Sequence, residues 1–393
     1  MKSFYWYFRP MALFAKLIGV FPLKNVLSGD PTKLSFKFIS FDNLYSTVIF
    51  GFYMGMIYYF SGFVNVQTAT LFQKCVMCSV LLRSCLSFGF VSRHSRKLPE
   101  LIKLLDRFDR KKSKVLLVKF SKWYINLLLW TILPSIFMVL VLIATFCNYS
   151  QLYIAVVPKD NQQMIDGYVV SMSFGFLSIW QTLPIMSYMY FGWKIRCSFK
   201  EINTTIKLRQ YCGCFFEEHK KYDDSMSMIL KNIRFLHNML SKCVNELGQC
   251  YGGYLAMEHA FIILVIIINI GAYIYSINHD ISLLIITAIH ATLFFLAVIV
   301  SDEIQEKGKD IIVQFQGLYL DAISLESERE IRMLMLQLNL CPVKVNAAGF
   351  FILDKKRLSS IITSIATHLI VMIQFIEEET KLNCCNSSNS FDF

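Results

Sequence analysis

A stripe of polar residues runs along an apolar segment near the end of the chain. From Ser360 onward its members recur at offsets of 3, 4, 7, 8 and 14, which place them on one face of an α-helix. The stripe consists of Ser359, Ser360, Thr363, Ser364, Thr367, His368 and Gln374. Polar groups inside hydrocarbon need hydrogen-bonding partners or water. Two interpretations follow: the stripe binds neighbouring helices of a bundle, or it lines an aqueous pore.

Two apolar residues, Ile370 and Val371, interrupt the stripe just before Gln374. In a pore, such residues are suited to a narrow gate that closes by losing its water. Glu377, Glu378 and Glu379 follow directly. In an oligomeric pore they would form an acidic ring that concentrates cations, and otherwise they form a solvated acidic tail.

The stripe lies in the last of seven long apolar segments. A helix needs about 20 apolar residues to cross about 30 Å of hydrocarbon. The windows that meet this requirement are 44–64, 69–91, 123–147, 168–193, 255–276, 281–300 and 359–375. The last window is short, and the charged run Asp354–Arg357 separates it from the apolar run Gly349–Leu353. We therefore expect the seventh helix to start below the membrane and to enter it near Leu358.

The composition agrees with a membrane protein. The 393 residues are 55% hydrophobic and 17% charged, with a mean hydropathy of +0.48, whereas soluble domains are about 25% charged. The net charge of +11 does not indicate nucleic-acid binding, because the basic residues lie between the apolar segments. The predicted fold class is an all-α membrane protein with seven transmembrane helices.

The basic residues also predict its orientation. Of the Lys and Arg residues in the connecting segments, 32 fall on one side of the membrane and 2 on the other. The rich side is cytoplasmic, so the N-terminus is expected in the cytoplasm and the C-terminus outside. The sequon at Asn148 then lies outside and is a predicted glycosylation site, whereas the one at Asn203 lies inside and should be unused.

This topology divides the chain into seven regions. They are a cytoplasmic segment 1–43, helices one to four in 44–193, a cytoplasmic helical linker 194–254, helices five and six in 255–300, cytoplasmic anchor helices in 301–357, the seventh helix 358–376, which is the candidate pore helix, and an extracellular tail 377–393. Amphipathic patterns in 225–244 and 311–340 predict that helices continue below the membrane and pack together there. Such a layer suits either subunit assembly or a cap on a monomer. The first 24 residues are expected to lie against the membrane or to pack on the bundle.

A ligand pocket is expected in the outer half of the bundle, where aromatic and polar side chains mix. Its candidate residues are Tyr168, Ser171, Ser173, Trp180 and Gln181 on helix four, Asn269 and Tyr273 on helix five, and Thr287 and His290 on helix six. Each of these is also suited to ordinary packing between helices. Two intramembrane charges, Arg83 and Glu258, are expected to pair inside the bundle.

The end of the seventh helix resembles a known family. Residues Thr367-His-Leu-Ile-Val-Met-Ile-Gln-Phe375 resemble the C-terminal signature of insect gustatory receptors, which is Thr-Tyr, five hydrophobic residues and Gln-Phe. The approach from Gly349 and the opening residues Arg9-Pro10 and Gly19–Pro22 are also similar to that family. One departure is His368, which stands where the family usually has Tyr and introduces a group that titrates near pH 6.5.

The resemblance implies a gustatory receptor that acts as a tastant-gated, non-selective cation channel in the plasma membrane. It implies a homotetramer, or a hetero-oligomer with related receptors, whose seventh helices line a central pore and whose cytoplasmic helix ends form a shared anchor. The implied partners are a small-molecule tastant, monovalent and divalent cations, and membrane lipid. The expected pore and gate residues are Thr363, Thr367, His368, Ile370, Val371, Gln374 and Phe375.

Other classes fit less well. A G-protein-coupled receptor has its N-terminus outside, and helix three lacks an Asp-Arg-Tyr ending. A secondary transporter would show two related halves, which the sequence lacks. An insect odorant-receptor-type channel subunit is the nearest alternative. No enzyme motif is present, and the Cys75/Cys78 pair lacks a second pair for a metal site, so we expect neither an enzyme nor a cofactor.

Overall fold

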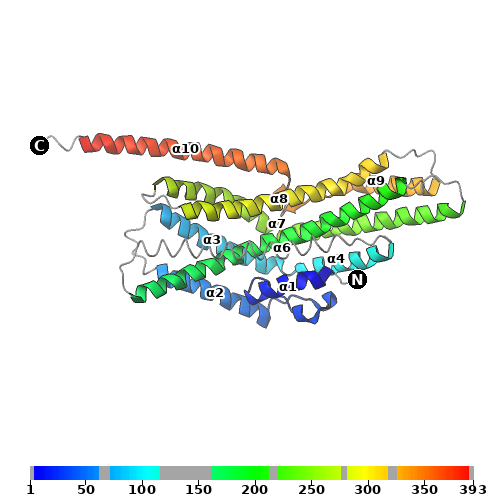
Figure 1. Ribbon diagram of the computed structural model, residues 1–393, viewed down its shortest axis with the longest axis horizontal. Helices are drawn as coiled ribbons and strands as arrows, with labels where there is room; N and C mark the ends of the chain where they lie inside the picture. The colour runs from blue at the N-terminus through cyan, green and yellow to red at the C-terminus, as the bar shows by residue number, and fades with distance from the viewer. Residues whose placement is uncertain are drawn as a thin grey trace.

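The computed structural model describes residues 4–61, 71–115, 161–211, 220–275, 281–316 and 325–388. Over these residues the regular secondary structure is helical apart from one two-stranded antiparallel hairpin and an isolated bridge between Lys24 and Ser35 (Figure 1). The α-helices are α1 (Phe4–Leu17), α2 (Phe41–Ser61), α3 (Leu71–His94), α4 (Leu98–Val115), α6 (Asn161–Tyr211), α7 (Lys220–Tyr275), α8 (Ile281–Gln316), α9 (Leu325–Leu340) and α10 (Lys355–Ser388). Two short 3₁₀ helices span Val26–Ser28 and Pro31–Lys33, and the strands are β1 (Asn346–Ala347) and β2 (Phe351–Ile352).

Helices α6, α7 and α8 are much longer than a membrane crossing. Helices α6, α7 and α8 contain 51, 56 and 36 residues, so at about 1.5 Å per residue each exceeds the roughly 30 Å of hydrocarbon. They run side by side along the long axis of the molecule (Figure 1). These lengths agree with the prediction that helices continue beyond the membrane.

The predicted spans fall on these helices. Windows 44–64, 69–91 and 168–193 coincide largely with α2, α3 and α6, and the last three windows lie in α7, α8 and α10. Span 123–147 and Asn148 lie outside the described residues. Within the described part of the chain, three helices are long and apolar enough to cross a membrane, in Ser227–Gly271, Thr287–Phe315 and Lys355–Phe375. The all-α membrane class is confirmed.

Small residues let the central helices approach closely. A Cβ atom at Gly192 of α6 would lie 2.7 Å from Cγ1 of Val300 on α8, so a larger residue would push the two helices apart. One turn away, the Tyr188 hydroxyl and the Ser301 hydroxyl are 2.5 Å apart. Close packing and a buried hydrogen bond thus join α6 to α8.

The N-terminal segment packs on the bundle, which is one of its two predicted positions. Phe4 and Phe8 of α1 are buried, and their rings lie 5.6 Å and 4.7 Å from the ring of Phe191 on α6. The Tyr5 hydroxyl donates to the carbonyl of Val26 at 2.8 Å, which fixes the chain that follows α1.

Ion pairs connect the helices of the predicted cytoplasmic layer. Lys194 of α6 lies 2.8 Å from Asp109 of α4. Other pairs join α6 to α8 (Arg196–Glu303, 2.7 Å) and α7 to α9 (Arg234–Glu330, 2.9 Å). The predicted packing of these helices is confirmed, and the joining of subunits by this layer stays a prediction.

The sequon at Asn203 is inaccessible in this layer. Its side chain is only 5% exposed and its Nδ2 donates to the carbonyl of Lys307 at 2.8 Å. The burial provides a physical reason for the prediction that this sequon is unused.

The approach to the last helix is a hairpin. The apolar run before Asp354 forms the second strand of the β1–β2 pair, in which Asn346 opposes Ile352. Helix α10 begins at Lys355, ahead of Leu358, as predicted. It also continues to Ser388, well past the predicted end at residue 376, because Glu, Lys and Leu residues in 377–382 favour a helix.

Candidate functional site

Helix α10 leaves the bundle after its first turns. Ile361 near its start is 1% exposed, but Ile370 and Phe375 further along are 58% and 68% exposed. Figure 1 shows α10 along one edge of the molecule, with its C-terminal part extending away from α7 and α8. The predicted pore and gate residues are all exposed, namely Thr363, Thr367, His368, Ile370, Val371, Gln374 and Phe375. In a single chain, therefore, the packing of the bundle does not cover this helix.

The polar stripe of α10 bonds to its own backbone. The hydroxyls of Thr363 and Thr367 donate to the carbonyls four residues earlier, at 3.0 Å and 2.9 Å. Nδ1 of His368 lies 2.7 Å from the carbonyl of Ser364. These local bonds occupy the hydroxyl protons but leave oxygen lone pairs on the helix surface. The stripe thus still offers acceptors to water, to ions or to a second chain.

The hairpin before α10 lies on two glycines of α7. A Cβ atom at Gly252 would lie 2.6 Å from both the backbone nitrogen of Ala348 and the carbonyl oxygen of Asn346. At Gly248, one turn earlier, the nearest atom would again be the Asn346 oxygen, at 3.1 Å. Only the missing side chains allow this backbone contact. The motif Gly248-x-x-x-Gly252 therefore lets the hairpin backbone pack directly against α7.

Polar contacts attach the start of α10 to α8. Gln305 of α8 donates to the carbonyl of Leu353 at 2.7 Å. Lys355 forms an ion pair with Asp302 at 2.9 Å, and its backbone N–H also donates to that carboxylate. The base of α10 is thus fixed to α7 and α8, whereas Ile370 and Phe375 further along the helix are exposed.

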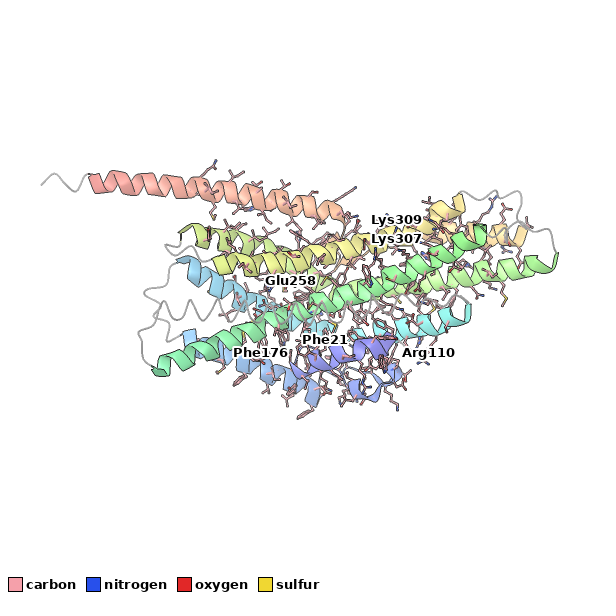
Figure 2. All side chains as sticks on the ribbon, viewed as in Figure 1. Phe21, Arg110, Phe176, Glu258, Lys307 and Lys309 are labelled. Atoms are coloured by element: carbon pink, nitrogen blue, oxygen red, sulfur yellow. The ribbon has the colours of Figure 1, made fainter. Side chains whose placement is uncertain are left out.

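A buried ion pair joins α3 to α7, as predicted. The Arg83 side chain donates to both carboxylate oxygens of Glu258, and their side chains are 6% and 2% exposed. Figure 2 labels Glu258 in the middle of the helical bundle. A charge this deep is retained because its partner satisfies it.

The predicted ligand residues of α6 pack into the bundle. The Trp180 ring lies 5.5 Å from the ring of Phe50 and 5.6 Å from that of Phe88. Gln181 donates to the hydroxyl of Ser84 at 2.5 Å. Tyr168, Ser171 and Ser173 lie on α6, but their side chains are outside the described part of the structure. Trp180 and Gln181 therefore have structural contacts that explain their burial.

The predicted residues of α7 and α8 meet each other. The Asn269 amide donates to the Thr287 hydroxyl, and both side chains are buried. His290, one turn along α8, is also buried, and Tyr273 is half-buried on α7. The structure thus brings part of the predicted set together at one α7–α8 contact.

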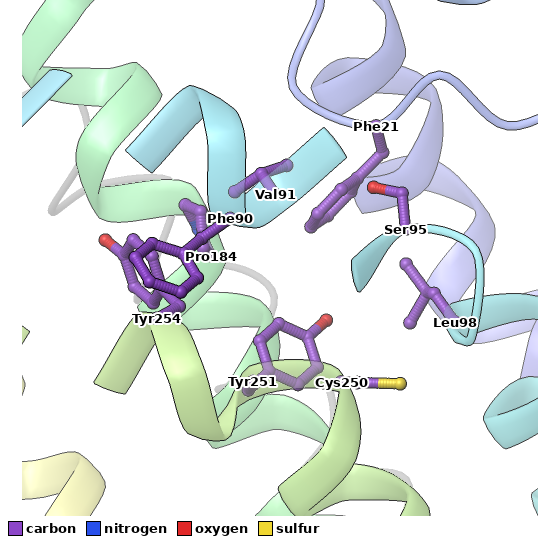
Figure 3. A pocket seen from close by; sticks show the side chains of 9 residues that line it. All are labelled: Phe21, Phe90, Val91, Ser95, Leu98, Pro184, Cys250, Tyr251 and Tyr254. Carbon is purple, nitrogen blue, oxygen red and sulfur yellow. The ribbon is translucent and has the colours of Figure 1, made fainter. Parts of the chain in front are cut away.

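A small cavity lies elsewhere, between α3, α6 and α7 (Figure 3). Tyr251 and Tyr254 of α7, Phe90 of α3 and Pro184 of α6 line it, and its volume is about 10 Å³. This volume holds at most one water molecule. The cavity contains none of the predicted ligand residues, and it is too small for a tastant.

Several residues with structural roles were absent from the sequence predictions. Tyr254 donates to the carbonyl of Gln181, and Ser187 donates to the Tyr251 hydroxyl at 2.9 Å. The hairpin contact at Gly248 and Gly252 was also absent. The spacing of the two glycines was the available signal, because small residues four apart permit close backbone contact. Among the described residues no group of His, Cys, Asp and Glu is arranged to hold a metal ion.

Comparison with known proteins identifies the family. A family model described as 7tm chemosensory receptor matches residues 8–379. The fold is similar to that of the insect olfactory receptor OR5 from Machilis hrabei, with a TM-score of 0.61, 14% identity, and coverage of 94% of this chain and 98% of that chain. The same receptor in complex with eugenol gives a TM-score of 0.62 at 15% identity, with equal coverage. No curated protein matches the sequence. On the family match across nearly its whole length, the chain belongs to the 7tm chemosensory receptors.

Proposed function

We propose that the protein is a gustatory receptor that acts as a tastant-gated, non-selective cation channel in the plasma membrane. The observation that carries the proposal is the uncovered α10, whose polar stripe and intervening apolar residues are exposed in the single chain. In a membrane, exposed polar side chains on a spanning helix call for a water-filled lining. Four copies of α10 around one axis would supply it.

The proposed gate lies near the outer end of that pore. Ile370 and Val371 would narrow the pore and exclude water, and Gln374 and Phe375 would complete the constriction. The same four-chain arrangement accommodates related receptors as partner subunits. Monovalent and divalent cations would pass once the constriction widens.

The proposed mechanism is a population shift. A tastant that binds near Asn269 and Thr287 changes the packing of α7 against α8, and it favours the conformer it fits better. The start of α10 is fixed to these two helices through Gly252 and Asp302. A change in the α7–α8 packing would therefore move the base of the pore helix.

Recording currents from cells that express this chain alone, against a panel of sugars, bitter compounds and volatile compounds, tests the proposal. We expect a tastant-evoked cation current, with conduction or gating altered in Gln374→Ala. Surface expression without any current would reject a channel that works alone. An unchanged current in Gln374→Ala would reject the pore assignment.

An odorant-receptor-type channel is the second candidate, because the fold is similar to that of an olfactory receptor, including its complex with eugenol. The ending Gln374-Phe375 resembles the gustatory branch and favours the first candidate. A response restricted to volatile compounds, with none to sugars or bitter compounds, would support the second.

A further inference from the structure

A groove lies between α4 and α7, away from α10 and from the predicted tastant residues. Its volume is about 390 Å³, which is within the range of small-molecule sites. On α4 its residues recur at helical spacing, as Arg107, Arg110 and Lys111. On α7 the lining includes Phe235 and Lys242. Both helices thus present one continuous stripe to the groove.

The groove concentrates unbalanced positive charge. Arg110 is neutralised by Asp106 at 2.7 Å. Arg107, Lys111 and Lys242 are exposed, and within the described part of the chain no carboxylate lies within ion-pair distance of them. Three uncompensated cations on one rim attract an anion of matching charge.

Several neighbouring cations in the same layer form ion pairs. Lys112 faces away from the groove and pairs with Glu201, and Lys194 pairs with Asp109 at 2.8 Å. Arg234 on α7 pairs with Glu330 at 2.9 Å. Other exposed cations, such as Lys200 and Lys231, also have no carboxylate of the described residues within ion-pair distance, so what distinguishes the groove is that three such cations line one hollow.

The floor of the groove is apolar. Leu104 and Met239 line it, and Phe235 remains 44% exposed. The Lys111 ammonium lies 4.0 Å from the centre of the Phe235 ring. A cationic rim over an apolar floor suits a ligand with phosphate groups at one end and a flat ring at the other.

The position of the groove favours a soluble ligand over a lipid. Phe235 and Lys242 precede the predicted start of the span at Leu255 by 20 and 13 residues, which corresponds to roughly 20–30 Å of helix. If the span begins at Leu255, a lipid headgroup at the membrane surface would lie too far away to reach these side chains. In the predicted orientation the groove opens to the cytoplasm.

We propose that this groove binds a soluble nucleoside triphosphate from the cytoplasm. The phosphates would lie against Arg107, Lys111 and Lys242, and the base would lie against Phe235 and the apolar floor. The proposal rests on the predicted orientation and is independent of channel activity.

Binding to the purified full-length chain tests the proposal. Equilibrium dialysis of ATP at low and at physiological salt should show saturable binding that weakens as salt rises. Arg107→Gln with Lys242→Gln should weaken binding at least tenfold. The control is Lys309→Gln with Arg329→Gln, which removes the same charges from exposed positions on α8 and α9 and should change binding less than twofold. Figure 2 shows Lys309 and Arg110 on opposite sides of the bundle.

Two further measurements locate the ligand. Phe235→Ala should weaken binding of ATP but leave binding of inorganic triphosphate unchanged. Lys111→Gln alone should weaken both ligands about threefold, which gives a readout if the double variant does not fold. No ATP binding, or equal losses in the groove and control variants, would overturn the proposal. Groove-dependent binding only to vesicles that contain phosphoinositides would overturn it in favour of a lipid.

Discussion

Arg83 on α3 and Glu258 on α7 form a two-point ion pair inside the bundle, with Nε–Oε1 and Nη2–Oε2 distances of 3.1 Å and 2.5 Å. The two residues are 175 positions apart in the sequence. Each group satisfies the charge of the other, so the loss of one leaves a buried charge without compensation. The pair therefore fixes how α3 sits against α7.

Arg83→Leu should destabilise the protein by about 3–5 kcal/mol, because the Glu258 carboxylate stays buried without a partner. Thermal unfolding in detergent and surface expression would measure the loss. The double variant Arg83→Leu/Glu258→Leu should recover most of it. Arg93→Leu, at an exposed position on the same helix, should have little effect. A double variant as unstable as the single one would argue against charge compensation.

Gly252→Ala should disturb the packing of the β1–β2 hairpin against α7. The new methyl group would lie 2.6 Å from backbone atoms of Asn346 and Ala348, which cannot rotate away. We expect a loss of about 1–3 kcal/mol from overpacking, and altered gating, since the hairpin leads directly into α10. Gly89→Ala is the control, because nothing lies within 4 Å of its added Cβ. Normal stability and gating in Gly252→Ala would show that the contact is not required.

His237 should make stability depend on pH. It lies on α7 before the predicted span, and burial lowers its pKa to about 4, although Nε2 contacts the carbonyl of Gly308 at 3.1 Å. The unfolded value is about 6.5, so the unfolded state binds more protons between pH 6.5 and pH 4. The free energy of unfolding is therefore not reduced by this group above pH 6.5. It falls by up to about 3 kcal/mol as the pH drops toward 4.

Melting temperatures of wild type and His237→Gln between pH 7.5 and pH 4.5 would test this. The variant should lose part of the acid sensitivity, because Gln keeps a donor for Gly308 and does not titrate. His368→Gln removes an exposed imidazole and should leave the acid sensitivity as it was. Identical pH profiles for wild type and His237→Gln would contradict the prediction.

The approximate positions of the long helices among the described residues follow from the sequence, because hydrophobic windows such as 255–276 report local composition. Helix α4 and the extension of α10 past residue 376 were not predicted. The Arg83–Glu258 pair was also predictable, since two opposite charges in hydrocarbon need each other. The hairpin at 346–352 was not, because its strands are two residues long and depend on backbone contact with Gly252. The ligand set was predicted from residue type and from depth in the membrane. Neither property distinguishes a side chain that packs inside the bundle from one that could contact a ligand. Trp180 packs against α2 and α3, whereas Asn269 donates to Thr287.

Val371→Ser tests whether α10 lines a pore. Val371 lies within the polar stripe, so in the proposed tetramer a hydroxyl there would keep the constriction wet. We expect a current without ligand, measured in cells at matched surface expression. Ile373→Ser is the control, because Ile373 is on the same helix, is also exposed, and lies on the face opposite the stripe. It should show no such leak, since its side chain would face away from the axis. Equal currents from the two variants would reject an orientation in which the stripe faces the pore.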